Sequence, residues 1–93
     1  DRIASAVADV FDVPAETLNS SRRLRSLVIP RQMAMHIARE LTRLKLVEIG
    51  QHFGNRNHST VVHACRKLEQ RMKDDVRLRR QRAQAVEALR PGH

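Results

Sequence analysis

Apolar residues recur at helical spacing near the start of the chain and predict a first helix over residues 2–11. Pro14 is compatible with a first helical turn, so a short second helix is expected to end near Leu18. The polar run at residues 19–21 then breaks the helical pattern. The stripe of the first helix consists of Ile3, Val7 and Val10, with Phe11 beside them.

The middle of the chain carries a longer helical pattern. Pro30 is expected to open it, because proline is tolerated in a first turn and disfavours helix at the preceding residue. Periodicity alone would draw one helix over residues 30–53, which is a poor unit for a small domain. We therefore expect a break near residues 42–45, although neither glycine nor proline marks it. The stripe before the break consists of Met33, Ile37, Leu41 and Leu44.

Gly54-Asn55 stops this pattern, and a further apolar stripe predicts a helix over about residues 59–73. Two aspartates then favour a last helix over about residues 74–89, because acids complement the dipole of a helix start. No sustained alternation indicates a strand. The sequence thus predicts one all-α domain over residues 1–93, with about six helices and a helix-turn-helix at about 46–73.

The charge of the chain narrows the class of partner. Lys and Arg number 18 against 10 Asp and Glu, a net charge of +8. Residues 1–21 carry one base against four acids, whereas residues 22–93 carry 17 bases against six acids. Such an excess indicates a polyanion, and nucleic acid is the leading interpretation. The alternatives are a solvated helical surface or a module that docks acidic protein or acidic phospholipid.

Nothing in the sequence indicates catalysis or a bound cofactor. Ser59 follows His58, but adjacent residues at a helix start do not face each other as nucleophile and base must. The spacing of His58, His63 and Cys65 points to diverging helix faces, a weak zinc pattern. The single cysteine excludes an intrachain disulfide, and no stretch is apolar enough for a membrane span. We predict no enzymatic activity, no metal and no cofactor for this chain.

The segment Glu48–Gly54, continued by Arg56–Leu68, resembles the C-terminal signature of the bacterial chromosomal replication initiator family, DnaA. Arg22–Ser26 and Pro30–Met35 match the same domain in order and spacing. The resemblance is weakest over residues 74–93. It implies a cytoplasmic, nucleoid-associated bacterial domain, monomeric when isolated, that binds short asymmetric boxes in double-stranded DNA at replication origins. It also implies an upstream ATPase domain, absent from this chain, where ATP would bind.

The same resemblance places the tip of the helix-turn-helix in the major groove. Amide, imidazole and hydroxyl groups donate or accept hydrogen bonds at base edges, and a threonine methyl can contact a thymine methyl. The alternative for Asn57 or Ser59 is that the side chain only caps the helix. The implied base contacts are Asn57, His58, Ser59 and Thr60.

Arg23 is implied as the minor-groove residue, since the narrow groove of A·T-rich DNA has a deepened negative potential that attracts a guanidinium. Arg22 and Arg25 are alternatives for this role. Other bases and helix starts are implied as phosphate contacts. The implied phosphate contacts are Arg22, Arg25, Arg31, Gln32, Lys45, Leu46, Arg56 and Lys67.

Two positions depart from the family pattern. Asn57 stands where the family commonly has an acid; a carboxylate accepts from cytosine N4, whereas an amide can pair with adenine. Lys45 and Val47 replace the small polar and proline residues that the family often has at the turn between the helices, which weakens the signal for a helix start near residue 46. A stand-alone DnaA-like regulator or a transposase-associated DNA binder remains the nearest alternative to an initiator domain.

Overall fold

The structure is a computed structural model that describes residues 2–92. This part of the chain folds into six α-helices and one short 3-10 helix, and it contains no strand. The predicted all-α class is therefore confirmed. The elements are α1 (Arg2–Phe11), α2 (Ala15–Leu18), η1 (Arg25–Leu27), α3 (Val28–Leu41), α4 (Leu46–His52), α5 (His58–Asp74) and α6 (Val76–Ala88).

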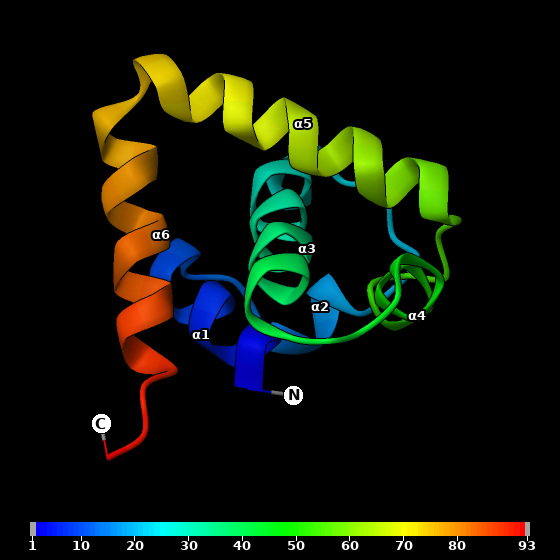
Figure 1. The fold of residues 1–93 in the computed structure, drawn as a ribbon, viewed down its shortest axis with the longest axis horizontal. Helices are drawn as coiled ribbons and strands as arrows, with labels where there is room; N and C mark the ends of the chain where they lie inside the picture. The colour runs from blue at the N-terminus through cyan, green and yellow to red at the C-terminus, as the bar shows by residue number, and fades with distance from the viewer. Residues whose placement is uncertain (1, 93) are drawn as a thin grey trace.

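Helix α3 lies at the centre, and α5 crosses it while α6 turns back beside α1 (Figure 1). Helix α4 lies near the first turns of α5, so that the helix-turn-helix forms one end of the molecule (Figure 1). The core between these helices contains Phe53, which is 1% exposed. Burying a side chain of this kind contributes about 1.5–3 kcal/mol. The other large buried side chains are Leu18, Met33, Met35, Ile37, Ile49, Leu68, Val7, Val61 and Cys65.

The predicted break between α3 and α4 is confirmed, and Thr42 explains it. The Thr42 hydroxyl donates to the carbonyl of Ala38 at 2.5 Å and accepts from the backbone N–H of Leu44 at 3.2 Å. The Thr42 side chain thus forms hydrogen bonds with backbone groups, and these bonds compete with those of a further helical turn. Because the chain leaves the helix here, Leu41 and Leu44 are 52% and 45% exposed. Their predicted place on the core stripe was wrong.

The predicted start of α3 also needs correction. The helix begins at Val28 rather than at Pro30, because η1 leads directly into it. Pro30 occupies the third helical position, where its missing N–H has no partner within the helix in any case. No helix among residues 2–92 has both the length and the apolar character needed to span a membrane.

Cys65 lies inside the core, as its place on the apolar stripe predicted. Burial raises the pKa of its thiol, and a hydrogen bond with Arg39 acts in the opposite direction. A buried thiol of this kind packs as a small apolar side chain.

Candidate nucleic-acid interface

The turn between α4 and α5 is held by backbone geometry that only particular residues allow. Gly54 and Asn55 adopt left-handed φ angles of +95° and +57°. The backbone N–H of Arg56 then donates to the carbonyl of Gly50 at 2.7 Å. A Cβ on Gly50 would overlap the carbonyl oxygen of Arg56. The turn therefore packs directly against the backbone of α4, and this contact fixes the angle between α4 and α5.

Asn57 caps the first turn of α5. Its Oδ1 accepts from the backbone N–H of Thr60 at 2.8 Å and from the Thr60 hydroxyl at 3.0 Å. Asn57 therefore acts as a helix cap, a role that leaves its base contact untested, and the helix starts at His58 rather than at Ser59. The side chains at positions 57–60 are all exposed, so the predicted base contacts lie together on an open tip. Their contact with DNA stays a prediction.

Arg31 organises the loop that carries the predicted minor-groove arginine. The residue is 5% exposed, and its guanidinium donates to backbone carbonyls. These acceptors follow α2 or lie in its last turn, so one side chain holds the loop against α3. The acceptors are Leu18 at 3.2 Å, Arg22 at 2.8 Å, Thr17 at 2.7 Å and Ser20 at 3.1 Å.

These hydrogen bonds correct the prediction that Arg31 opens a helix with its side chain free to contact a phosphate. The sequence placed the residue at an exposed helix start, whereas it lies in the second turn of α3 with its donors turned toward the protein. We therefore leave Arg31 out of the proposed phosphate contacts. A short apolar run before a proline gave no sign that the following arginine would be buried.

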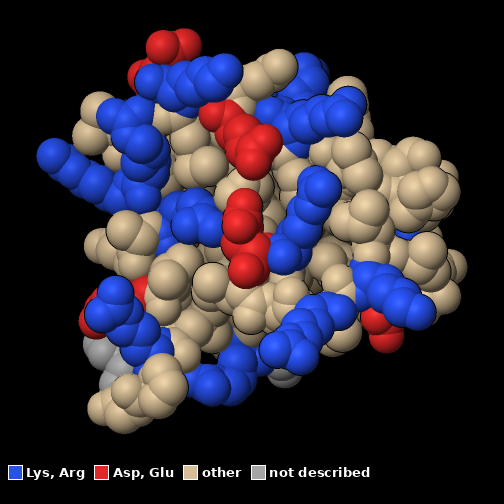
Figure 2. All heavy atoms as spheres, in the orientation of Figure 1, with Lys and Arg blue, Asp and Glu red and all other residues tan. Residues whose placement is uncertain are grey.

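Basic side chains are spread around most of the face drawn in Figure 2, and acidic side chains occupy smaller patches between them. Net charge alone therefore does not single out one surface for a polyanion. A group of arginines without a neighbouring carboxylate identifies one surface more clearly.

A hollow of about 660 Å³ separates the loop at residues 21–25 from the turn at residues 54–57. Arg23, Arg25, Arg31 and Arg56 line it, and none of its lining residues is an acid. Burial lowers the pKa of Arg31 and of Arg56, and like charge adds to both effects: Arg56 acts on Arg31, and Arg23 acts on Arg56. Crowded guanidinium groups without a carboxylate favour an anionic ligand in the hollow.

The other predicted phosphate contacts lie outside this hollow. The backbone N–H of Lys45 already donates to Glu48 Oε1 at 2.8 Å, and lysine has no acceptor with which to complete a capping box. Leu46 begins α4, and Lys67 is exposed farther along α5. The Oε1 atom of Gln32 is buried and accepts no hydrogen bond from residues 2–92. A phosphate would need the other end of that amide, its NH₂ group.

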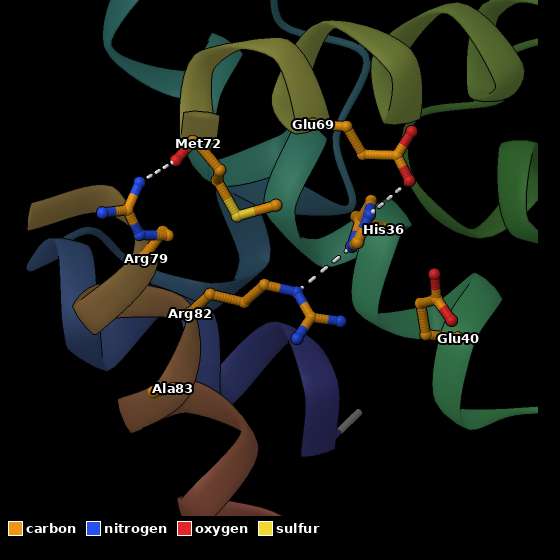
Figure 3. Close-up of a pocket in the computed structure, with 7 residues that line it drawn as sticks. All are labelled: His36, Glu40, Glu69, Met72, Arg79, Arg82 and Ala83. Atoms are coloured by element: carbon orange, nitrogen blue, oxygen red, sulfur yellow. Dashed lines mark hydrogen bonds and ion pairs between the residues drawn. The ribbon is translucent and has the colours of Figure 1, made fainter. Parts of the chain in front are cut away.

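A second polar cluster joins α3, α5 and α6 (Figure 3). Arg82 Nε donates to His36 Nδ1 at 3.1 Å, and His36 Nε2 lies 3.2 Å from Glu69 Oε2. Because the arginine can only donate, His36 Nδ1 must accept, so Nε2 carries the proton and donates to Glu69. With Glu40 this group has the composition of a metal site. His36 Nε2 has no lone pair for a metal while Arg82 donates to Nδ1. The cluster therefore fits a structural role, in which its hydrogen bonds hold α6 against α3 and α5.

Comparison with known proteins gives a consistent result. The model of the family described as "Bacterial dnaA protein helix-turn-helix" matches residues 1–68. The chromosomal replication initiator protein DnaA of Geotalea daltonii is 42% identical over 79 residues, which cover 85% of this chain and 18% of that protein. The protein of the same name from Anaplasma marginale is 46% identical over 76 residues, covering 82% of this chain and 16% of that protein. The chain thus spans less than a fifth of the length of these curated relatives.

Proposed function

The chain belongs to the family of bacterial DnaA helix-turn-helix domains, and we propose that it binds short asymmetric boxes in double-stranded DNA at a bacterial replication origin. The observation that carries this proposal is the hollow of arginines without a carboxylate, which lies between the tip of α5 and the loop of Arg23. Two exposed segments with a cationic hollow between them suit two adjacent grooves and the sugar–phosphate ridge that separates them.

In this proposal the first turn of α5 enters the major groove, where His58, Ser59 and Thr60 contact base edges together with Asn57. Arg23 enters the neighbouring minor groove. The ridge between the grooves lies over the hollow, so its phosphates meet guanidinium groups that lack acidic partners there. The proposed phosphate contacts are Arg22, Arg25, Gln32, Lys45, Leu46, Arg56 and Lys67.

The proposal gives these residues no bond-making step. They bind and position DNA, as a monomer in the bacterial cytoplasm on the nucleoid, while any use of ATP belongs to other parts of a longer initiator. The relatives are several times longer than this chain, so a part in initiation itself rests on the family membership.

The first test is selection of bound duplexes from a random pool, followed by measurements on the selected box. We expect His58→Ala to weaken binding to that box by about 1–3 kcal/mol, because the exposed imidazole is proposed to touch a base edge. Binding to a random duplex, which depends on phosphates, should change far less. Fluorescence anisotropy at one fixed salt concentration measures both affinities.

His63→Ala is the matched control, since His63 is also exposed on α5 but lies beyond its first turn. It should leave both affinities within a few tenths of a kcal/mol of the unmodified protein. If the pool yields no shared box, the proposal of sequence-specific binding is wrong. Equal retention by vesicles of acidic phospholipid and by random DNA would then favour a basic docking module.

The minor-groove role of Arg23 gives a separate prediction. Arg23→Ala should weaken boxes with an A·T-rich flank by about 1–2 kcal/mol more than boxes with a G·C-rich flank, because only the narrow groove rewards an inserted guanidinium. Arg43→Ala serves as the control, since Arg43 is an exposed arginine between α3 and α4 and does not line the hollow. A loss independent of flank sequence would assign Arg23 to phosphate binding instead.

A further inference from the structure

The amide of Asn57 has a fixed orientation. Its Oδ1 faces the backbone N–H of Thr60 at 2.8 Å, and a backbone N–H can only donate. The oxygen and nitrogen of this amide are therefore distinguishable without any assumption about DNA. The Thr60 hydroxyl uses the other lone-pair direction of the same oxygen, at 3.0 Å.

Both acceptor positions of Asn57 are thus occupied inside the protein. The NH₂ group donates no hydrogen bond within residues 2–92, and it belongs to an exposed side chain. The hydrogen of the Thr60 hydroxyl is likewise used, because Asn57 Oδ1 can only accept. The helix cap therefore gives the tip a defined polarity, in which residue 57 presents donors and the Thr60 hydroxyl presents an acceptor.

We propose, on the basis of the proposed major-groove binding, that Asn57 determines box specificity as a donor-only residue that selects guanine at one base pair and rejects cytosine. Guanine offers two acceptors in the major groove, N7 and O6, which match the two hydrogens of the NH₂ group. Cytosine offers the N4 amino donor, which would face another donor. Bidentate pairing with adenine requires a free amide oxygen, and the cap has removed it.

The matched variant is Asn57→Asp. Aspartate caps a helix as well as asparagine does, so one carboxylate oxygen is expected to keep both bonds from Thr60. Its second oxygen then replaces the NH₂ group and turns a donor into an acceptor, for which cytosine N4 is the suitable partner. Replacing the NH₂ group by an oxygen should therefore change the preferred base from guanine to cytosine, which reverses the orientation of one G·C pair in the selected box.

The experiment selects duplexes from one random pool with the unmodified protein, Asn57→Asp and Asn57→Ser. Serine keeps a capping oxygen but lacks the amide. We expect the unmodified protein to prefer G·C over C·G about tenfold at one position, Asn57→Asp to reverse that preference, and Asn57→Ser to reduce it to about twofold or less. Circular dichroism measures whether all three proteins are equally helical.

The outcomes separate this inference from the function on which it rests. If the unmodified protein enriches no shared box, the proposed function fails and the inference fails with it. If all three proteins enrich a box with the same base pair at every position, sequence-specific binding stands and the donor role of Asn57 is wrong. Reversal at one position, with the remaining positions unchanged, supports both.

Discussion

Replacing Gly50 by alanine is expected to lower the free energy of unfolding by about 3 kcal/mol, the upper end of the range for overpacked positions. The new methyl group would overlap the carbonyl oxygen of Arg56 and press on the side chain of Val61. A backbone carbonyl cannot move aside as a flexible side chain can, and the backbone of Arg56 is further held by the hydrogen bond from its N–H to the carbonyl of Gly50, at 2.7 Å. The two motif helices would have to separate.

Thermal unfolding followed by circular dichroism measures this change. For a domain of this size a loss of about 3 kcal/mol corresponds to a fall in Tm of about 12–24 °C. Gln51→Ala is the matched control, because Gln51 is the next residue of α4 and is exposed. Its Tm should stay within a few degrees of the unmodified protein. A Gly50→Ala protein of unchanged Tm would show that the turn does not rest on α4 as described.

Gly50 also shows which parts of the fold could be predicted from the sequence and which could not. Hydrophobic spacing predicted the helices, including α4, because a 3.6-residue period follows from burying one face of a helix. A glycine inside such a pattern indicates a close approach of backbone, but it does not say which segment approaches. That information depends on the tertiary path of the turn at residues 54–57, where two left-handed residues redirect the chain.

The candidate site was predicted in its composition but not in its internal hydrogen bonding. The exposed tip at residues 57–60 and the exposed arginines at 22, 23 and 25 lie where the sequence and the resemblance placed them. Arg31 could not be predicted, because a lone arginine in an amphipathic helix is usually solvated. It is buried against four carbonyls in the last turn of α2 and the loop that follows, and hydrophobic periodicity does not predict such acceptors.

These hydrogen bonds link stability to the proposed function. Folding buries the guanidinium groups of Arg31 and Arg56 beside other arginines, and burial, with like charge as the smaller cause, lowers the pKa of both. An arrangement of this kind costs free energy in the free protein and is relieved when an anion binds. The loop of Arg23 is therefore expected to be positioned before DNA arrives, so that binding does not have to order it.

Replacing Arg31 by lysine tests this link directly. Lysine keeps the charge but lacks the planar fork, so it cannot reach carbonyls of Leu18, Thr17, Ser20 and Arg22 at once. We expect the free energy of unfolding to fall by about 3 kcal/mol, because at least two buried or partly buried acceptors lose their donor. Affinity for the selected box should also fall, by about tenfold, since the loop of Arg23 would have to be ordered on binding.

Denaturant unfolding gives the first quantity, and anisotropy at a temperature where the variant is fully folded gives the second. Arg43→Lys is the control, as an exposed arginine for which lysine should serve equally well. The affinity measurement distinguishes positioning from direct contact: adding Arg23→Ala to Arg31→Lys should cost less than adding it to the unmodified protein, because a loosened loop has already lost part of that contact. If the two costs simply add, Arg31 stabilises the fold without positioning Arg23, and the coupling between the loop and the minor groove is wrong.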